Sequence, residues 1–163
     1  MDVSNSIIIG VLSGVLSTTL LFLLSKFTSQ ILIPWYQNLI YNGTNIGGVW
    51  YAQLYFDDGS KAEYKLAIKQ NATKLNATMI YVYSQEGKSS EIKNFKLSGY
   101  IKERFIHLNG VNIDNRQIGI VSYLFEFIGN GNVLKGEYSC YDTSDCQINS
   151  FSKTFVRERS EDE

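Results

Sequence analysis

The chain has 163 residues, a formal net charge of −1, 44% apolar and 13% aromatic residues, and a single proline. This composition suits a globular domain, and it excludes a collagen, a proline-rich linker, a disulfide-dense mini-protein and a basic nucleic-acid-binding arm. The charges are uneven, because residues 1–45 contain only Asp2 and Lys26, so the chain divides into a part suited to lipid and a part suited to water.

Residues 7–24 form an uncharged apolar run, IIIGVLSGVLSTTLLFLL, without Asn, Gln or Pro. As a helix this run would be roughly 27 Å long, close to the thickness of the hydrocarbon core of a bilayer. We therefore predict a transmembrane helix within residues 1–30, in preference to a buried core helix. A signal peptide is the other alternative, but it usually begins with basic residues and residues 1–6 carry none. Lys26 follows the run and only Asp2 precedes it, which predicts a single-pass membrane protein with its C-terminal domain in the cytoplasm.

Two rows of small residues mark one side of this predicted helix. Gly10 and Gly14 are four residues apart, and Ser13 and Ser17 repeat that spacing. Such rows allow two membrane helices to approach closely, so we expect helix packing at Gly10 and Gly14 and a homo-oligomer. The alternative is that these are simply the small residues common in membrane helices.

The next segment, residues 31–45, is predicted to be an interfacial collar. Its run ILIPWYQNLIY is short and interrupted by Pro34, and Trp35, Tyr36 and Tyr41 favour the boundary between membrane and water. A second, short or re-entrant membrane segment is the alternative.

Beyond residue 45 the apolar residues recur with a period of two, in runs separated by Gly, Asn, Asp and Ser. Turn sequences such as Asp57-Asp58-Gly59-Ser60 join consecutive runs closely, which favours an antiparallel meander. We predict a mainly β fold, with an eight-stranded antiparallel up-and-down, lipocalin-like barrel over residues 46–158 and a disordered acidic tail at 159–163. The predicted strands are 47–56, 61–71, 75–84, 91–99, 101–109, 117–128, 133–141 and 150–158.

Two residues suggest how the barrel is closed. The triplet Gly48-Val49-Trp50 in the first strand and Arg157 in the last resemble the calycin or lipocalin arrangement, in which a tryptophan closes one end of the barrel. That resemblance implies that Arg157 packs across Trp50, where a cation over an indole contributes about 0.5 to 2 kcal/mol.

The order of features along the whole chain also resembles a known family. The features, in chain order, are the N-terminal membrane segment, the triplet Pro34-Trp35-Tyr36 followed by residues 38–43 (NLIYNG), the triplet Gly48-Val49-Trp50, and the triplet Gly136-Glu137-Tyr138. Together they resemble the membrane-anchored β-barrel effectors of bacterial cyclic-nucleotide antiphage defence, the SMODS-associated transmembrane β-strand-rich domain found in CBASS and Panoptes systems. The resemblance implies a barrel that binds a cyclic di- or oligonucleotide made by a partner synthase. It also implies an oligomer that disrupts the inner membrane and causes cell death or growth arrest.

A cyclic nucleotide site needs aromatic faces that stack on bases and Arg or Lys side chains that bind phosphates. The alternation of the strands places several such side chains toward the barrel interior, although the tyrosines could instead only fill the barrel. The candidate ligand-binding residues are Tyr81, Tyr83, Arg104, Tyr123, Tyr138 and Lys153.

Motifs for catalysis or metal binding do not emerge from the sequence. The single histidine, His107, lies in a predicted strand, and neither a cluster with metal-ligand spacing nor a glycine-rich phosphate loop is present. We predict a protein that is not an enzyme and that has no metal and no cofactor. Cys140 and Cys146 are expected to stay thiols in a reducing cytosol, with a small bridge as the alternative.

Other readings remain open at this stage. The barrel could be a membrane-anchored, lipocalin-like binder of a small apolar ligand, or a solid structural adaptor. Sequons at Asn42, Asn71 and Asn76 would matter only in a luminal domain, the alternative topology. The 14 basic and 15 acidic residues beyond position 45 create no strong overall field, so long nucleic acid is not an expected partner.

Overall fold

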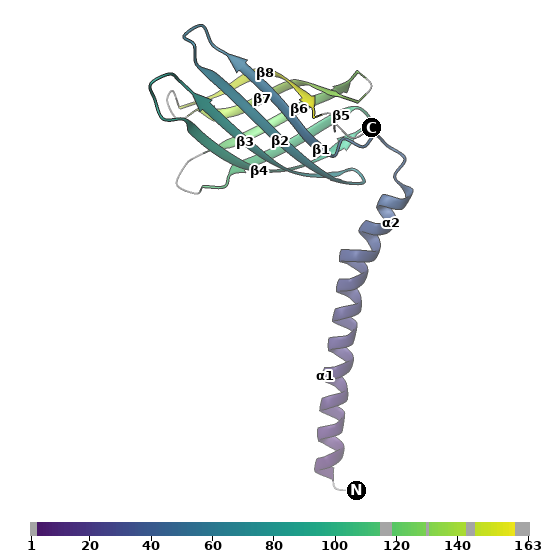
Figure 1. Cartoon of the computed structure of the whole chain (residues 1–163). Coiled ribbons are helices and arrows are strands. Elements are labelled where there is room, and N and C mark those ends of the chain that lie inside the picture. Colours follow the sequence, from purple (N-terminus) through teal and green to yellow (C-terminus); the bar gives the residue numbers. More distant parts are fainter. Residues whose placement is uncertain (1–2, 115–118, 130, 143–145, 159–163) are drawn as a thin grey trace. The chain divides into compact units, whose positions relative to one another are not determined.

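The structure is a computed structural model, which describes residues 3–114, 119–129, 131–142 and 146–158 (Figure 1). The chain separates into two compact units, residues 1–41 and 42–163. The predicted acidic tail, 159–163, and the first two residues of the sixth predicted run, 117–118, lie outside the described residues.

The first unit is helical from Val3 to Ile40. It comprises α1 (Val3–Phe27), a π-helical turn η1 (Thr28–Leu32) and α2 (Ile33–Ile40). The stretch Asn5–Ile40 has 36 residues and is long and apolar enough to cross a membrane. At 1.5 Å per residue it measures roughly 54 Å, so a bilayer core of about 30 Å would enclose only part of it. The prediction of an apolar N-terminal helix of membrane-spanning length is confirmed.

The helix continues past Pro34, where the sequence suggested an interruption. Proline lacks an N–H group, and inside a helix its ring clashes with the carbonyl four residues earlier. Here η1 precedes it, with the Ile33 N–H donating to the carbonyl oxygen of Thr28, and Pro34 occupies the first turn of α2. A missing N–H has little cost at that position. Much of the predicted collar is therefore helix, which ends where Tyr41 adopts an extended backbone.

Gly10 and Gly14 lie within α1. A Cβ atom added to either glycine would meet nothing within 4 Å. No contact inside the described chain therefore requires a glycine at these positions. Packing of a second helix against them stays a prediction.

The second unit is a closed antiparallel barrel in which each strand pairs with the next (Figure 1). The circle closes where β1 pairs with β8, through Trp50 opposite Arg157 and Tyr51 opposite Val156. This confirms the predicted eight-stranded antiparallel barrel. Its strands are β1 (Gly48–Tyr55), β2 (Lys61–Asn71), β3 (Lys74–Ser84), β4 (Glu91–Lys102), β5 (Phe105–Asn112), β6 (Ile120–Ile128), β7 (Val133–Asp142) and β8 (Gln147–Arg157).

The boundary between β4 and β5 differs from the prediction, which ended the fourth strand at Gly99. The chain instead turns at Glu103, whose φ is 56°. Gly99 lies inside β4, where an added Cβ would overlap the carbonyl oxygen of His107 on β5. The glycine therefore permits a close approach of two strands and does not form a turn.

The hydrophobic core lies inside the barrel, because alternate residues of each strand point inward. The buried hydrophobic side chains of the described chain range from Ile46 to Phe155, so all of them belong to the second unit. The barrel thus contains a complete core of its own, and residues 42–163 can be studied as an independent domain.

One end of the barrel, where β1 begins and β8 ends, is closed by Trp50. This indole is 0% exposed, and its Nε1–H donates to the carbonyl oxygen of Ile46 at 3.0 Å. The guanidinium carbon of Arg157 lies 5.4 Å from the Trp50 ring centre, and its Nη2 donates to the carbonyl oxygen of Gly47. The cavity lies at the opposite end of the barrel, where β1 connects to β2.

Candidate ligand-binding site

A cavity of about 330 Å³ lies in the half of the barrel away from Trp50. Its volume falls within the range of about 300 to 1,000 Å³ found for small-molecule sites. The walls come from β1, β2, β3, β4, β6, β7 and β8, each contributing residues near the same end of the barrel. Rings dominate this lining, namely Phe56, Tyr64, Tyr81, Phe95, Tyr123, Tyr138, Tyr141 and Phe151.

Four of the tyrosines form one connected cluster. The ring centre of Tyr64 is 5.0 Å from that of Tyr81, and its hydroxyl is 3.4 Å from the Tyr138 hydroxyl. Tyr138 in turn stacks on Tyr123, with ring centres 5.3 Å apart. The hydroxyl of Tyr123 donates to the sulfur of Met79 at 2.6 Å. The cluster thus offers aromatic faces to the cavity and holds its rings in fixed positions.

Burial keeps these phenols neutral. It raises the pKa of Tyr138 to about 12, and it raises the pKa values of Tyr64, Tyr81 and Tyr123 above the usual value for tyrosine. A neutral phenol donates one hydrogen bond and accepts others. At physiological pH the cluster therefore adds hydrogen-bonding groups to the cavity without adding negative charge.

Lys153 lies behind this cluster and is 7% exposed. It points inward from β8, where it lies opposite Gly136 of β7. Its Nζ is 3.8 Å from the ring centre of Tyr64 and 5.8 Å from that of Tyr138. Desolvation by burial lowers the pKa of the Lys153 amine.

The lysine is unusual because no acid accompanies it. The ion pairs among described residues are Lys61–Glu63, Lys93–Glu91 and Arg104–Glu126, and none involves Lys153. Contact with the tyrosine faces is a partial substitute, since a cation over an aromatic ring gains about 0.5 to 2 kcal/mol. Buried charges are normally paired with an opposite charge. The arrangement therefore favours an anion in the cavity.

The six predicted ligand-binding residues are distributed unevenly. Tyr81, Tyr123 and Tyr138 line the cavity. Lys153 contacts two of the lining rings, as described above. Tyr83 is outside the lining but packs edge-on against Phe56, which belongs to it, with ring centres 6.1 Å apart.

The inward placement of Arg104 was wrong. The sequence argument relied on its sharing parity with Ile106 and Leu108, which do point into the core. The chain turns at Glu103 and Arg104, so strand alternation does not extend to this residue. Its side chain is 67% exposed, and its Nη1 lies 3.2 Å from Glu126 Oε1.

Tyr64 and Lys93 line the cavity but were not among the candidates, although their parity could have revealed them. Tyr64 shares the inward face of β2 with Leu66 and Ile68 and is the centre of the tyrosine cluster. Lys93 shares parity with Phe95 on β4 and lines the cavity, with its Nζ 3.0 Å from Glu91 Oε1.

The remaining reactive side chains are separated from one another. Cys140 lines the cavity, Cys146 is exposed, and no disulfide joins these two described residues. His107 lies on the outer wall, with its ring centre 5.4 Å from that of Tyr100. Within the described part of the chain, no three His, Cys, Asp or Glu residues are grouped so that they could hold a metal ion.

No protein-family model matches the chain, and no curated protein sequence matches it. Among solved structures, the chain is similar to apo shwanavidin, with 15% sequence identity and a TM-score of 0.47, over 72% of this chain and 100% of that chain.

Proposed function

We propose that this protein is a membrane-anchored sensor whose barrel binds a small, flat, anionic molecule, with a cyclic di- or oligonucleotide as the expected ligand. The observation that carries the proposal is Lys153, which is buried behind a tyrosine-lined cavity and forms no ion pair with any described residue. Bases stack on aromatic rings, and phosphate oxygens accept hydrogen bonds from ammonium and phenol groups. The cavity combines all three kinds of group.

The size of the cavity indicates how such a ligand would bind. A volume of about 330 Å³ is at the lower end of the range for ligand sites. We expect one base and a neighbouring phosphate to enter between the tyrosines. The rest of the ligand would lie at the mouth, where Lys93 provides a second cation.

The resemblance of the whole chain to antiphage effectors supports the remaining parts of the proposal. In that scheme a partner synthase makes the ligand, and binding controls an oligomer of the N-terminal helix that disrupts the inner membrane. A ligand controls such an equilibrium in either direction, provided that it binds one state more tightly than the other. The chain would be an effector and not an enzyme, with its barrel in the cytoplasm.

Calorimetry tests the ligand. Residues 42–163 are titrated with a panel of cyclic di- and trinucleotides, in parallel with Lys153→Met and with Lys135→Met, an exposed lysine on β7 as the matched control. A charge-assisted hydrogen bond contributes about 1.5 to 3 kcal/mol, so Lys153→Met should weaken binding about 10- to 100-fold. Lys135→Met should bind like the wild type. Failure of the wild-type barrel to bind any of these nucleotides would overturn the proposal.

A second candidate function rests on the non-aromatic part of the lining. Leu54, Met79, Ile120 and Val121 are apolar, so an uncharged lipid-like ligand would also contact the cavity walls favourably. Native mass spectrometry of the purified barrel would detect such a ligand. Its affinity should be unchanged or higher in Lys153→Met, whereas the affinity of an anionic ligand should fall about 10- to 100-fold.

A further inference from the structure

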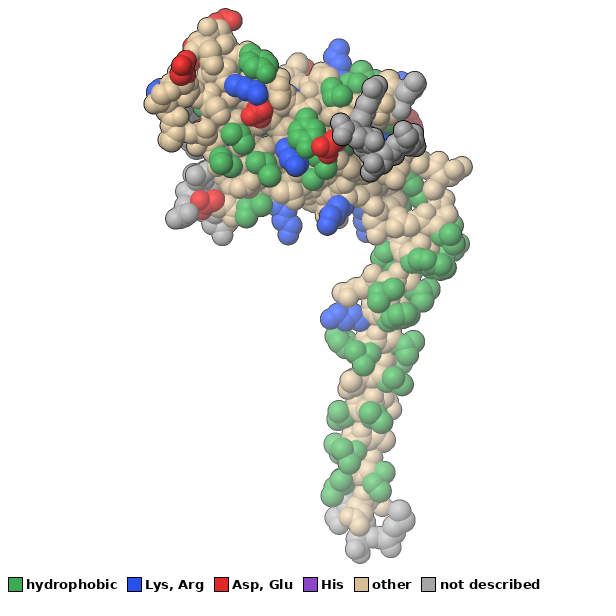
Figure 2. Space-filling model, viewed as in Figure 1, with side chains coloured by type: hydrophobic (Ala, Val, Ile, Leu, Met, Phe, Trp, Pro, Cys, Tyr) green, Lys and Arg blue, Asp and Glu red, His purple; other side chains and the backbone are tan. Residues whose placement is uncertain are grey.

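Lysine side chains gather on the outer surface of three neighbouring strands. Lys65 and Lys69 lie on β2, Lys74 on β3, and Lys96 and Lys102 on β4, and all five are exposed. We call this set the lysine face. Figure 2 shows Lys and Arg side chains along the lower edge of the barrel, with no acidic side chain among them in that view.

Acidic side chains are almost absent from this surface. None of the lysine-face residues takes part in an ion pair with a described residue, since the three pairs that exist lie elsewhere. The outward positions between them carry neutral side chains, for example Asn76 opposite Ser98 and Thr78 opposite Lys96. The positive charge of this surface is therefore not neutralised by neighbouring residues.

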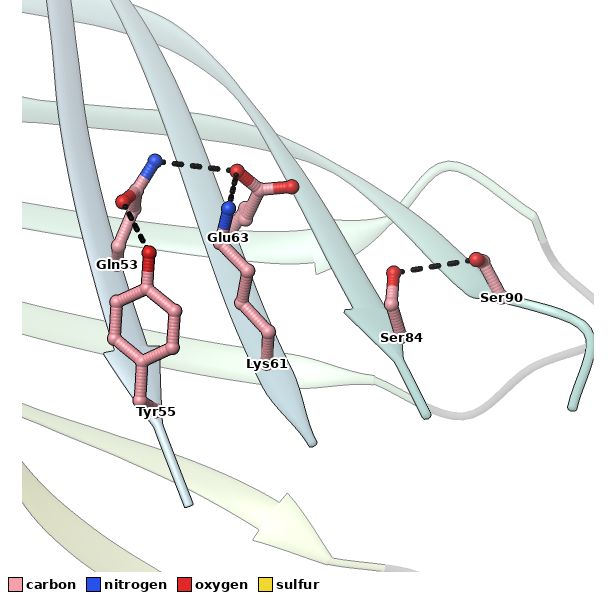
Figure 3. Close-up of polar contacts among 6 residues, drawn as sticks. All are labelled: Gln53, Tyr55, Lys61, Glu63, Ser84 and Ser90. Carbon is pink, nitrogen blue, oxygen red and sulfur yellow. Dashed lines mark hydrogen bonds and ion pairs between the residues drawn. The ribbon is translucent and has the colours of Figure 1, made fainter. Parts of the chain in front are cut away.

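The nearest carboxylate on β2 is already engaged. Figure 3 shows Glu63 held by Lys61, at 2.7 Å, and by the side-chain amide of Gln53, at 3.2 Å. Gln53 in turn accepts a hydrogen bond from Tyr55 at 3.2 Å. This network lies toward the cavity end of β1 and β2. Glu63 is therefore paired with Lys61, which is not part of the lysine face, and forms no ion pair with the lysines of the face.

Apolar side chains accompany the lysines. Tyr100 lies directly opposite Lys74 in the sheet and is 52% exposed, and Ile80 lies opposite Lys65 and is 37% exposed. Tyrosine is favoured at membrane interfaces, where its ring contacts the boundary of the acyl chains and its hydroxyl contacts headgroups. A surface of lysines with interspersed tyrosine and isoleucine suits an interface that is both anionic and partly apolar.

We propose that the lysine face binds the anionic headgroups of a phospholipid bilayer. The same chain carries an apolar helix of membrane-spanning length, and tethering to a bilayer raises the local concentration of headgroups around the barrel. Each basic residue close to an anionic membrane surface contributes about 1 kcal/mol. Five lysines are thus enough for measurable binding to a membrane although the charges of the whole barrel nearly balance.

Nucleic acid is the competing polyanion, and the observations favour it less. Its binding proteins combine a basic surface with side chains that read base edges or stack on bases. Two rings beside this face are already in contact with other side chains, since Tyr100 packs against His107 and the Tyr51 ring centre lies 5.5 Å from Lys65 Nζ. Phe105 lies opposite Lys102 at the edge of the face. The inference rests on the membrane anchoring proposed above but not on the ligand of the cavity.

Vesicle co-sedimentation of residues 42–163 tests the inference. Wild-type barrel is compared on vesicles of phosphatidylcholine alone and of equal parts phosphatidylcholine and phosphatidylglycerol. The test variant is K69Q/K96Q, and the matched control is K88Q/K135Q, which removes the same charge from exposed lysines outside the face. We expect binding only to the anionic vesicles, a loss with added salt, and a reduction of about 30-fold in K69Q/K96Q. The control should stay within about twofold of wild type.

The full chain in proteoliposomes provides an independent readout through amine labelling and mass spectrometry. Lys69 and Lys96 should be protected relative to Lys88 and Lys135 when phosphatidylglycerol is present, and not when it is absent. Equal loss of binding in both double variants, equal protection of all four lysines, or binding to duplex DNA without binding to vesicles would each overturn the inference. Because calorimetry tests the cavity and vesicles test the lysine face, either proposal can fail alone.

Discussion

Replacing Lys153 with methionine should make the barrel more stable while it weakens binding of an anionic ligand about 10- to 100-fold. Methionine has a similar length and no charge, and the site is 7% exposed. The variant loses a cation–aromatic contact that contributes about 0.5 to 2 kcal/mol. It also removes the desolvation of a buried ammonium, which costs several kcal/mol. We therefore expect the free energy of unfolding to rise by about 1 to 3 kcal/mol.

Urea unfolding of residues 42–163 measures this change directly. Trp50 is the only tryptophan in that segment and is fully buried at the closed end, so its fluorescence reports loss of the barrel core. Lys135→Met, on the outer wall, is the control and should leave stability within about 0.5 kcal/mol of wild type. If Lys153→Met raises the free energy of unfolding and lowers the affinity for the ligand, Lys153 is retained for binding and not for stability. A destabilised Lys153→Met barrel that still binds the ligand would refute the reasoning.

The pH dependence provides a further check on the same residue. Burial lowers the pKa of Lys153 in the folded barrel below the ordinary lysine value of 10.5. Between the lowered pKa and 10.5 the unfolded chain binds more protons, so the lysine makes stability rise with pH. Wild type should therefore approach Lys153→Met in stability as the pH is raised toward 10.5. A difference that stays constant with pH would show that the amine is not desolvated in the barrel.

Three other predictions follow from the structure. Arg157→Ala should lower the free energy of unfolding by about 1 to 3 kcal/mol, because it removes both the contact with Trp50 and a hydrogen bond to a backbone carbonyl; urea unfolding measures it. Gly99→Ala should be at least as destabilising, about 2 kcal/mol or more, because its Cβ would overlap the facing strand, and thermal unfolding of the barrel tests this. Tyr138 should ionise near pH 12 in the folded barrel and near its ordinary pKa of 10.0 in urea, as followed by ultraviolet absorbance. Stability should accordingly fall as the pH rises above 10, since the unfolded phenols lose their protons first.

Control variants at exposed positions show whether these effects are specific to the residues named. Arg104→Ala removes an exposed ion pair and should change stability by less than about 1 kcal/mol. Ser98→Ala, next to Gly99 but facing outward, should be nearly neutral. If Arg157→Ala were as mild as Arg104→Ala, the closed end would not depend on the arginine. Ionisation of Tyr138 at the same pH in folded and unfolded chains would show that its phenol is open to water.

Local patterns in the sequence were sufficient for the layout of the chain. The uncharged run before Lys26 predicted an apolar helix, and alternation beyond residue 45 predicted eight antiparallel strands, because each pattern reflects the side that its own segment buries. Local patterns failed where a neighbour determined the outcome. Gly99 was taken as a break because the strand that approaches it was not visible in the sequence, and Arg104 was misplaced because parity ends where the chain turns.

The sequence by itself determined that Lys153 faces inward and that Lys65, Lys69 and Lys96 face outward, since alternation fixes the face of each strand residue. Only the tertiary structure decided what surrounds them. Closure of the barrel brings Tyr64 of β2 and Tyr138 of β7 to Lys153 of β8, although the three residues are far apart along the chain. Among the described residues, no ion pair involves that lysine. The pairing of β2, β3 and β4 likewise assembles five lysines into one face. The balanced net charge thus concealed a buried cation and a basic surface, because net charge carries no information about position.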